Sequence, residues 1–99
     1  MDNNKKTAIK LFEDYKVRTS WDNEKETWYF SVEDIVFVLT ESTDTKQYIK
    51  KMRKRDPELN SNWGTICTHV EMLAKDGKNR KVMASDTEGI LRLVQSIPS

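Results

Sequence analysis

The pattern of apolar and polar positions in the first third of the chain predicts a β-hairpin. Residues 7–13 (TAIKLFE) and 17–21 (VRTSW) carry β-branched and aromatic side chains and predict two short strands. A polar loop at residues 22–25 separates the second strand from the aromatic run at residues 27–30 (TWYF). A strand, a polar loop and a returning strand in that order indicate a hairpin.

A helical pattern follows this hairpin directly. Ser31 fits the N-cap position, and Asp34 stands three residues on, at the acidic position of a capping box. Four apolar residues then recur at i, i+3, i+4 and i+7: Val32, Ile35, Val36 and Leu39. This spacing predicts a helix with one buried face.

A second helix is expected to begin at residues 43–45 and to end near Arg55. Asp56 precedes Pro57, and the residue before a proline avoids helical backbone angles. The apolar stripe of this helix is thin, since it consists of Tyr48, Ile49 and Met52. Residues 58–64 (ELNSNWG) predict a connecting loop in which Trp63 points inward.

The last third of the chain predicts another hairpin and a closing helix. Residues 65–73 (TICTHVEML) alternate as in a strand, Asp76-Gly77 predicts a tight turn, and residues 80–84 predict the returning strand. Residues 85–88 (SDTE) form a Ser-x-x-Glu capping box. The buried face of the helix that follows is expected to consist of Ile90, Leu91, Val94 and Ile97. The predicted fold is therefore α+β, with short antiparallel strands and hairpins and three helices packed against them.

Length and composition restrict the class of protein. A chain of 99 residues fits a single domain, expected at residues 9–99 after a polar leader at residues 1–8 that is expected to be disordered. A single cysteine, Cys67, excludes an internal disulfide framework and indicates a reducing compartment, which is expected to be the cytoplasm. The longest apolar run, residues 35–39, is too short to cross a bilayer, so no membrane partner is expected.

The net charge of +1 conceals a gradient along the chain. Residues 44–56 contain six positive and two negative side chains, and residues 75–81 contain four positive and one negative. These segments carry +4 and +3, so the remainder sums to −6. Such asymmetry predicts two faces with different partners.

Residues suited to catalysis are few. Cys67 and His69 would lie about 7 Å apart on one side of a strand, which is too far for direct proton transfer. One cysteine and one histidine do not supply the three or four protein ligands that zinc requires. The three glycines are far apart, and no phosphate-binding loop or dinucleotide fingerprint is present. No enzymatic activity, cofactor or metal is therefore expected.

Two basic segments favour nucleic-acid binding, with duplex DNA as the expected partner. The second helix follows a shorter helix across a brief turn, as in a helix-turn-helix unit, and the later hairpin is placed to act as a basic wing. Phosphate contacts are expected from Lys50, Lys51, Arg53, Lys54 and Arg55 on the helix. Contacts to base edges are expected from Thr45, Lys46 or Gln47. Further backbone contacts are expected from the hairpin residues Lys75, Lys78, Arg80 and Lys81. The same charges also occur where a helix face is only exposed to solvent and where a hairpin only protects a sheet edge from pairing. This alternative to nucleic-acid binding stays open.

Two stretches of the chain resemble the N-terminal domain of the BRO family, which occurs in baculovirus BRO proteins and prophage antirepressors. They are residues 28–55 (WYFSVEDIVFVLTESTDTKQYIKKMRKR) and residues 84–99 (ASDTEGILRLVQSIPS), and the similarity covers about residues 9–99. The resemblance implies a DNA-binding, non-catalytic domain of a transcriptional regulator in bacterial cytoplasm, at the nucleoid, without a cofactor. It also implies the N-terminal part of a longer protein, and it assigns no DNA-contacting residue.

The alternative function is a protein-interaction module, because an antirepressor can act by binding a repressor. The acidic remainder of the chain would then meet a basic partner through Glu24, Glu26, Glu33, Asp34, Glu41 and Glu58. A homo-oligomer is the other protein partner considered.

Overall fold

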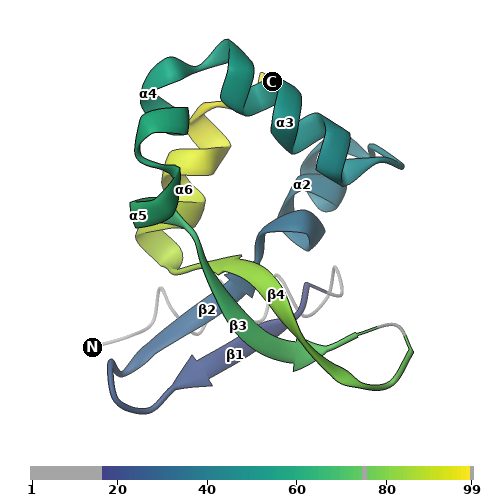
Figure 1. Cartoon of the computed structure of the whole chain (residues 1–99), viewed down its shortest axis with the longest axis vertical. Coiled ribbons are helices and arrows are strands. Elements are labelled where there is room, and N and C mark those ends of the chain that lie inside the picture. The colour runs from purple at the N-terminus through teal and green to yellow at the C-terminus, as the bar shows by residue number, and fades with distance from the viewer. Residues whose placement is uncertain (1–16, 75, 99) are drawn as a thin grey trace.

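The computed structural model describes residues 17–74 and 76–98, and it confirms the α+β class (Figure 1). Four strands form one antiparallel sheet in the order β1-β2-β4-β3. They are β1 (Thr19–Asp22), β2 (Thr27–Ser31), β3 (Thr68–Leu73) and β4 (Asn79–Ser85). Within these residues the helices are α2 (Val32–Thr40), α3 (Thr45–Arg55), α4 (Pro57–Ser61), α5 (Trp63–Ile66) and α6 (Thr87–Gln95). The expected strand at residues 7–13 and the leader at residues 1–8 lie outside the described residues.

The two faces of the sheet carry separate apolar clusters. Side chains alternate between faces along each strand, so Phe30 and Met83 point to one side and Tyr29 and Val82 to the other. The helices cover the first side, where the main core contains Phe30, Ile35, Met52, Leu59 and Leu93. On the second side the sheet curls until β1 approaches β3, which encloses the smaller cluster of Tyr29, Met72, Val82 and Ala84.

Helix α2 begins as the sequence predicts. Ser31 Oγ accepts a hydrogen bond from the Asp34 backbone N–H at 3.3 Å, and the Asp34 carboxylate pairs with Arg18 at 2.8 Å. The helix ends at Glu41, whose φ of 57° is left-handed. Leu39 was expected in the core but is 49% exposed, because it lies in the last turn, beyond the residues that α2 buries.

Helix α3 has the expected bounds because a side chain caps its start and a proline follows its end. Asp44 accepts from the Gln47 backbone N–H, and Asp56 follows the last turn ahead of Pro57. Ile49 and Met52 are buried, and Tyr48 is half-buried. The thin apolar stripe is therefore sufficient to attach this helix to the core.

The prediction of a loop at residues 58–64 is wrong, because this segment contributes to the short helices α4 and α5. Pro57 occupies the first turn of α4, where backbone N–H groups make no hydrogen bond within the helix, so the lack of an N–H in proline costs nothing there. Asp56 caps the helix by accepting a hydrogen bond from the Leu59 N–H. Leu59 and Trp63 are buried, so the inward direction expected for Trp63 is confirmed. As a consequence β3 begins at Thr68, three residues later than predicted.

Helix α6 is capped one residue later than the sequence analysis expected. Asp86 accepts from the Gly89 N–H, whereas Ser85 is fully buried at the end of β4 and donates to the Ile66 carbonyl. The buried face differs accordingly. Ile90 and Leu93 are buried and Ile97 is half-buried, but the expected core residues Leu91 and Val94 are 59% and 40% exposed.

Asp76 and Gly77 lie in the connection between β3 and β4, but the two-residue turn predicted there is wrong. The connection is longer, since β3 ends at Leu73, β4 begins at Asn79, and the Ala74 N–H donates to the Lys78 carbonyl. Gly77 has a φ of 83°, which a residue without a Cβ adopts easily. In the part of the chain with described coordinates, no helix has the length and apolar character needed to span a membrane.

Candidate nucleic-acid interface

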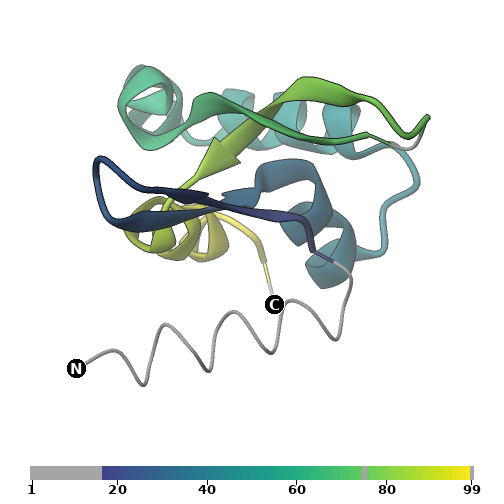
Figure 2. The ribbon, with the colours of Figure 1, turned by 90° about the horizontal axis from the view of Figure 1, so that it is seen from below.

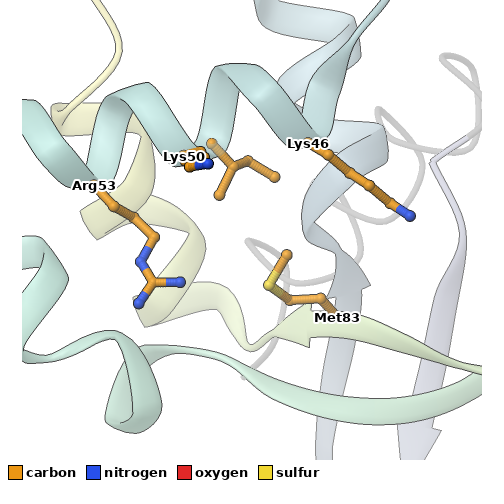
Figure 3. Close-up of a pocket in the computed structure, with 5 residues that line it drawn as sticks. Lys46, Lys50, Arg53 and Met83 are labelled. Carbon is orange, nitrogen blue, oxygen red and sulfur yellow. The ribbon is translucent and has the colours of Figure 1, made fainter.

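A groove separates α3 from β4, and three cations stand along one side of it (Figure 3). Its volume is about 250 Å³. Lys46, Lys50 and Arg53 line the groove from α3, together with Ile49 from the same helix and Met83 from β4. The three cations lie at spacings of four and three residues, which places them on one flank of the helix.

The floor of the groove is apolar. Ile49 belongs to the buried stripe of α3 and is 4% exposed, and Met83 is half-buried on the side of β4 that faces the helices. In Figure 3 the Met83 side chain points toward α3. Two apolar side chains therefore meet beneath a rim of positive charge.

Arg53 is held in place by two neighbours. Its Nε donates to Asn60 Oδ1 on α4 at 2.9 Å, and its guanidinium lies 4.7 Å from the centre of the Trp63 ring. A guanidinium above an aromatic ring is attracted by the negative face of the π-system. Arg53 thus presents an ordered planar cation to the groove, unlike the flexible lysines.

The outer surface of α3 carries several exposed lysine side chains. Lys50, Lys51 and Lys54 are exposed, as is Gln47 between them on the helix surface. Among the described residues, no carboxylate oxygen lies within 4.0 Å of the ammonium groups of Lys46, Lys50, Lys51 or Lys54. Their charge therefore remains available to a ligand.

The first turn of α3 has a different character. The Thr45 hydroxyl donates to Glu33 Oε1 at 3.0 Å, and Asp44 caps the helix. The carboxylates of Glu33 and Asp44 oppose a phosphate at the N-terminus of the helix, and Thr45 already has a partner for its hydroxyl, whereas the Lys46 side chain lines the groove. The positive surface is therefore centred on the middle and the C-terminal half of the helix.

Arg55 lies apart from the groove flank. Its Nη2 donates to the Ser96 carbonyl at 3.1 Å, beyond the last turn of α6. The side chain is exposed but directed toward the end of α6. The structure consequently separates it from Lys46, Lys50 and Arg53, although all belong to one basic run in the sequence.

The hairpin cations divide between the two faces of the sheet. Lys81 is opposite Glu71 and two residues from Met83, so it lies on the face toward α3. Arg80 is opposite Met72 on the other face and pairs with Asp76, which lowers the pKa of that carboxyl group. Lys78 is exposed in the turn, and Lys75 lies outside the described residues.

The helix and the hairpin nevertheless occupy the same side of the molecule. Figure 2 shows α3 and the β3–β4 hairpin in one layer, with β1, β2, α2 and α6 in the layer below. Groove residues come from both α3 and β4, which confirms that these elements border each other. Because the hairpin lies beside α3, Lys81 faces the helix, but Arg80 does not.

Cys67 and His69 do not share a strand face, contrary to the sequence-based expectation. The chain is still leaving α5 at Cys67, whose N–H donates to the Trp63 carbonyl, while His69 is exposed in β3. Burial raises the pKa of the Cys67 thiol to about 12, so the sulfur is protonated and unreactive at neutral pH. Across the described residues, no three side chains of the metal-binding types gather into a site.

Sequence reasoning found the cations but missed the groove between them. Met83 was assigned only to a returning strand, and Trp63 and Asn60 were placed in a loop. The positive run on α3 was the signal that pointed to this region, whereas the apolar floor depends on contacts between distant segments. Comparisons of the chain with protein-family models, with curated proteins and with solved structures found no match.

Proposed function

We propose that this chain is a non-catalytic DNA-binding domain of a transcriptional regulator, of the kind that the BRO resemblance implies. The observation that carries the proposal is the set of lysines on α3 that have no carboxylate partner among the described residues, two of which, Lys46 and Lys50, border the groove shared with β4. Lys50, Lys51 and Lys54 are placed to neutralise phosphates along a duplex backbone. Lys81 extends this surface onto the hairpin.

The character of α3 also suggests how bases are reached. Gln47 is exposed on the outer surface of the helix between the lysines, and its amide is suited to the paired donor and acceptor of an adenine edge. Lys46 lies beside the groove, one residue away. Thr45 contributes less than its position in the sequence implies, because its hydroxyl is bonded to Glu33.

A salt titration on duplex DNA tests this proposal. A protein that neutralises phosphates releases condensed counterions, so its affinity falls as salt rises. With about six to eight phosphate contacts, the slope of log affinity against log salt concentration is expected to be about −5 to −7. Fluorescence anisotropy with a labelled random duplex measures it. Absence of binding at low salt, or a flat slope, would rule the proposal out.

A second candidate, a protein-interaction module, is favoured by the large apolar side chains that remain exposed. Leu91 and Val94 lie one turn apart on α6, and Phe37 and Leu39 are about half exposed on α2. Charge reversal of Lys50, Lys51 and Lys54 separates the two functions, because it removes DNA retention and leaves binding of a repressor protein intact. Leu91→Glu with Val94→Glu is expected to give the opposite pattern.

A further inference from the structure

We propose that the groove between α3 and β4 receives one unpaired nucleotide, with its ring on the Ile49–Met83 floor and its phosphates at Lys46 and Lys50. This inference rests on the proposed DNA binding and specifies the form of nucleic acid that the same surface prefers. A bulged or extrahelical nucleotide in a duplex is the expected ligand.

The dimensions and lining of the groove favour a ligand of this size and polarity. Its volume of about 250 Å³ is below the range of about 300–1,000 Å³ typical of drug-sized ligands, so it suits a single ring system. A phosphate alone would leave the apolar floor in water, and an apolar group alone would make no use of the cations. A planar ring that carries a phosphate satisfies both requirements.

Arg53 adds a surface on which a ring can stack. Its guanidinium is fixed by Trp63 on one side and by Asn60 at Nε, and it lines the groove. Unpaired bases stack on guanidinium planes as well as on aromatic rings. Because these contacts already order Arg53, less side-chain entropy is lost when a base arrives.

The two lysines on the rim are spaced to hold the strand on either side of an inserted base. Lys46 and Lys50 are separated by one helical turn, about 6 Å along the axis of α3. Both are exposed, and in the described part of the chain neither ammonium group has a carboxylate partner. Phosphates that flank the inserted nucleotide would therefore meet one lysine each.

Three labelled duplexes of one sequence test the inference by fluorescence anisotropy. The first is fully paired, the second carries a single-nucleotide bulge, and the third carries the same bulge with the base removed. The bulged duplex is expected to bind about tenfold more tightly than the other two. Equal affinity for all three overturns the inference and leaves DNA binding in place, whereas binding to none removes the proposed function as well.

Filling the groove provides the matched variant. Met83→Trp is expected to abolish the preference for the bulge, so that the bulged and the paired duplex bind this variant with equal affinity. Leu91→Trp, at a side chain 59% exposed on α6, adds the same group elsewhere and is expected to retain the preference. A full bulge preference in Met83→Trp would exclude the groove as the site. Arg53→Lys keeps the positive charge but removes the planar guanidinium, so it is expected to reduce the preference for the bulged duplex. It gives a second readout if Met83→Trp unfolds.

Competition identifies the source of the nucleotide. A deoxynucleoside monophosphate is expected to bind wild type but not Met83→Trp. If it does so while the bulge adds no affinity to the duplex, the inference is overturned in favour of a free nucleotide. A glutamate-rich peptide with one phenylalanine tests whether the groove binds an acidic protein instead of a nucleic acid. Tighter binding of that peptide than of the bulged duplex overturns the inference in favour of an acidic protein.

Discussion

Gly89 occupies a position on α6 where a side chain would collide with its neighbours. A Cβ there would lie 1.7 Å from Ser85 Oγ and 2.8 Å from the Ile66 carbonyl oxygen. Ser85 is fully buried and donates to that same carbonyl, so neither group has room to move. The start of α6 can approach the end of α5 this closely only because residue 89 has no side chain.

Gly89→Ala is therefore expected to lower the free energy of unfolding by about 1–3 kcal/mol, as overpacking of a closed site does. Urea denaturation followed by circular dichroism measures the change. Gly64→Ala is the matched control, because a Cβ at Gly64 meets nothing within 4 Å and alanine favours the helix. Equal destabilisation of the two variants would contradict this account of the contact.

The buried thiol of Cys67 gives a second prediction for a single residue. Because burial raises its pKa to about 12, the native protein at about pH 8 holds almost no thiolate, the form that attacks alkylating reagents. Iodoacetamide is expected to modify Cys67 slowly in the native protein and rapidly in concentrated urea. Mass spectrometry over time measures both rates, and similar rates would show that the thiol is accessible in the fold.

At the scale of elements, Asp56 joins three helices. It ends α3, caps α4 through the Leu59 N–H, and contacts the end of α6 by accepting from Ser96 Oγ at 2.7 Å and pairing with Arg92 at 3.3 Å. The hydrogen bonds from Leu59 and Ser96, followed by Arg92, hold the pKa of Asp56 below its ordinary value. The charged form of this carboxylate therefore stabilises the junction.

The stabilisation by Asp56 is expected to depend on pH. A carboxyl group whose pKa is lower in the folded protein contributes stability above its unfolded pKa of about 3.9, and the contribution disappears as the pH falls through the folded pKa. Asp56→Asn retains a capping oxygen but not the charge, so its melting temperature should lie below that of wild type at neutral pH. The gap should close in acid, and thermal melts across the pH range measure it. A gap that does not change with pH would contradict the electrostatic origin.

The accuracy of sequence-based prediction differed between elements according to how local their determinants are. The bounds of α3 follow from Asp44 at its start and from Asp56-Pro57 at its end, all within the segment itself. The cap of α6 was misplaced by one residue because Ser85 and Asp86 are both good caps. Only the distant Ile66 carbonyl, which binds Ser85, decides between them. Helices α4 and α5 were missed because five-residue and four-residue helices are too short to show periodicity.

The candidate site was predictable only in its charges. The cations of α3 all lie within residues 46–55, and their helical spacing places Lys46, Lys50 and Arg53 on one flank. The groove floor pairs Ile49 with Met83, and Arg53 is ordered by Asn60 and Trp63. These contacts join separate elements, and no local pattern in the chain specifies them.

At the scale of the whole molecule, the placement of charge matters more than its total. Lys50→Glu and Lys25→Glu each change the net charge from +1 to −1. Lys25, however, lies in the turn between β1 and β2, which Figure 1 shows far from α3. Lys50→Glu is expected to weaken duplex binding by about tenfold or more, and Lys25→Glu by less than about twofold, because phosphate contacts are local. Anisotropy titrations at one salt concentration compare the two variants. An equal loss would indicate a general effect of net charge.

The hydrogen bonds between the ends of α3 and α6 couple the positions of these helices. Ser96 accepts from Arg55 through its carbonyl and donates to Asp56 through its hydroxyl, so two hydrogen bonds tie the C-terminal ends of the helices together. We therefore expect a displacement of the last turn of α6 to shift α3 as well. Because β4 forms the opposite wall of the groove, such a shift is expected to alter the width of the groove without any contact to the residues that line it.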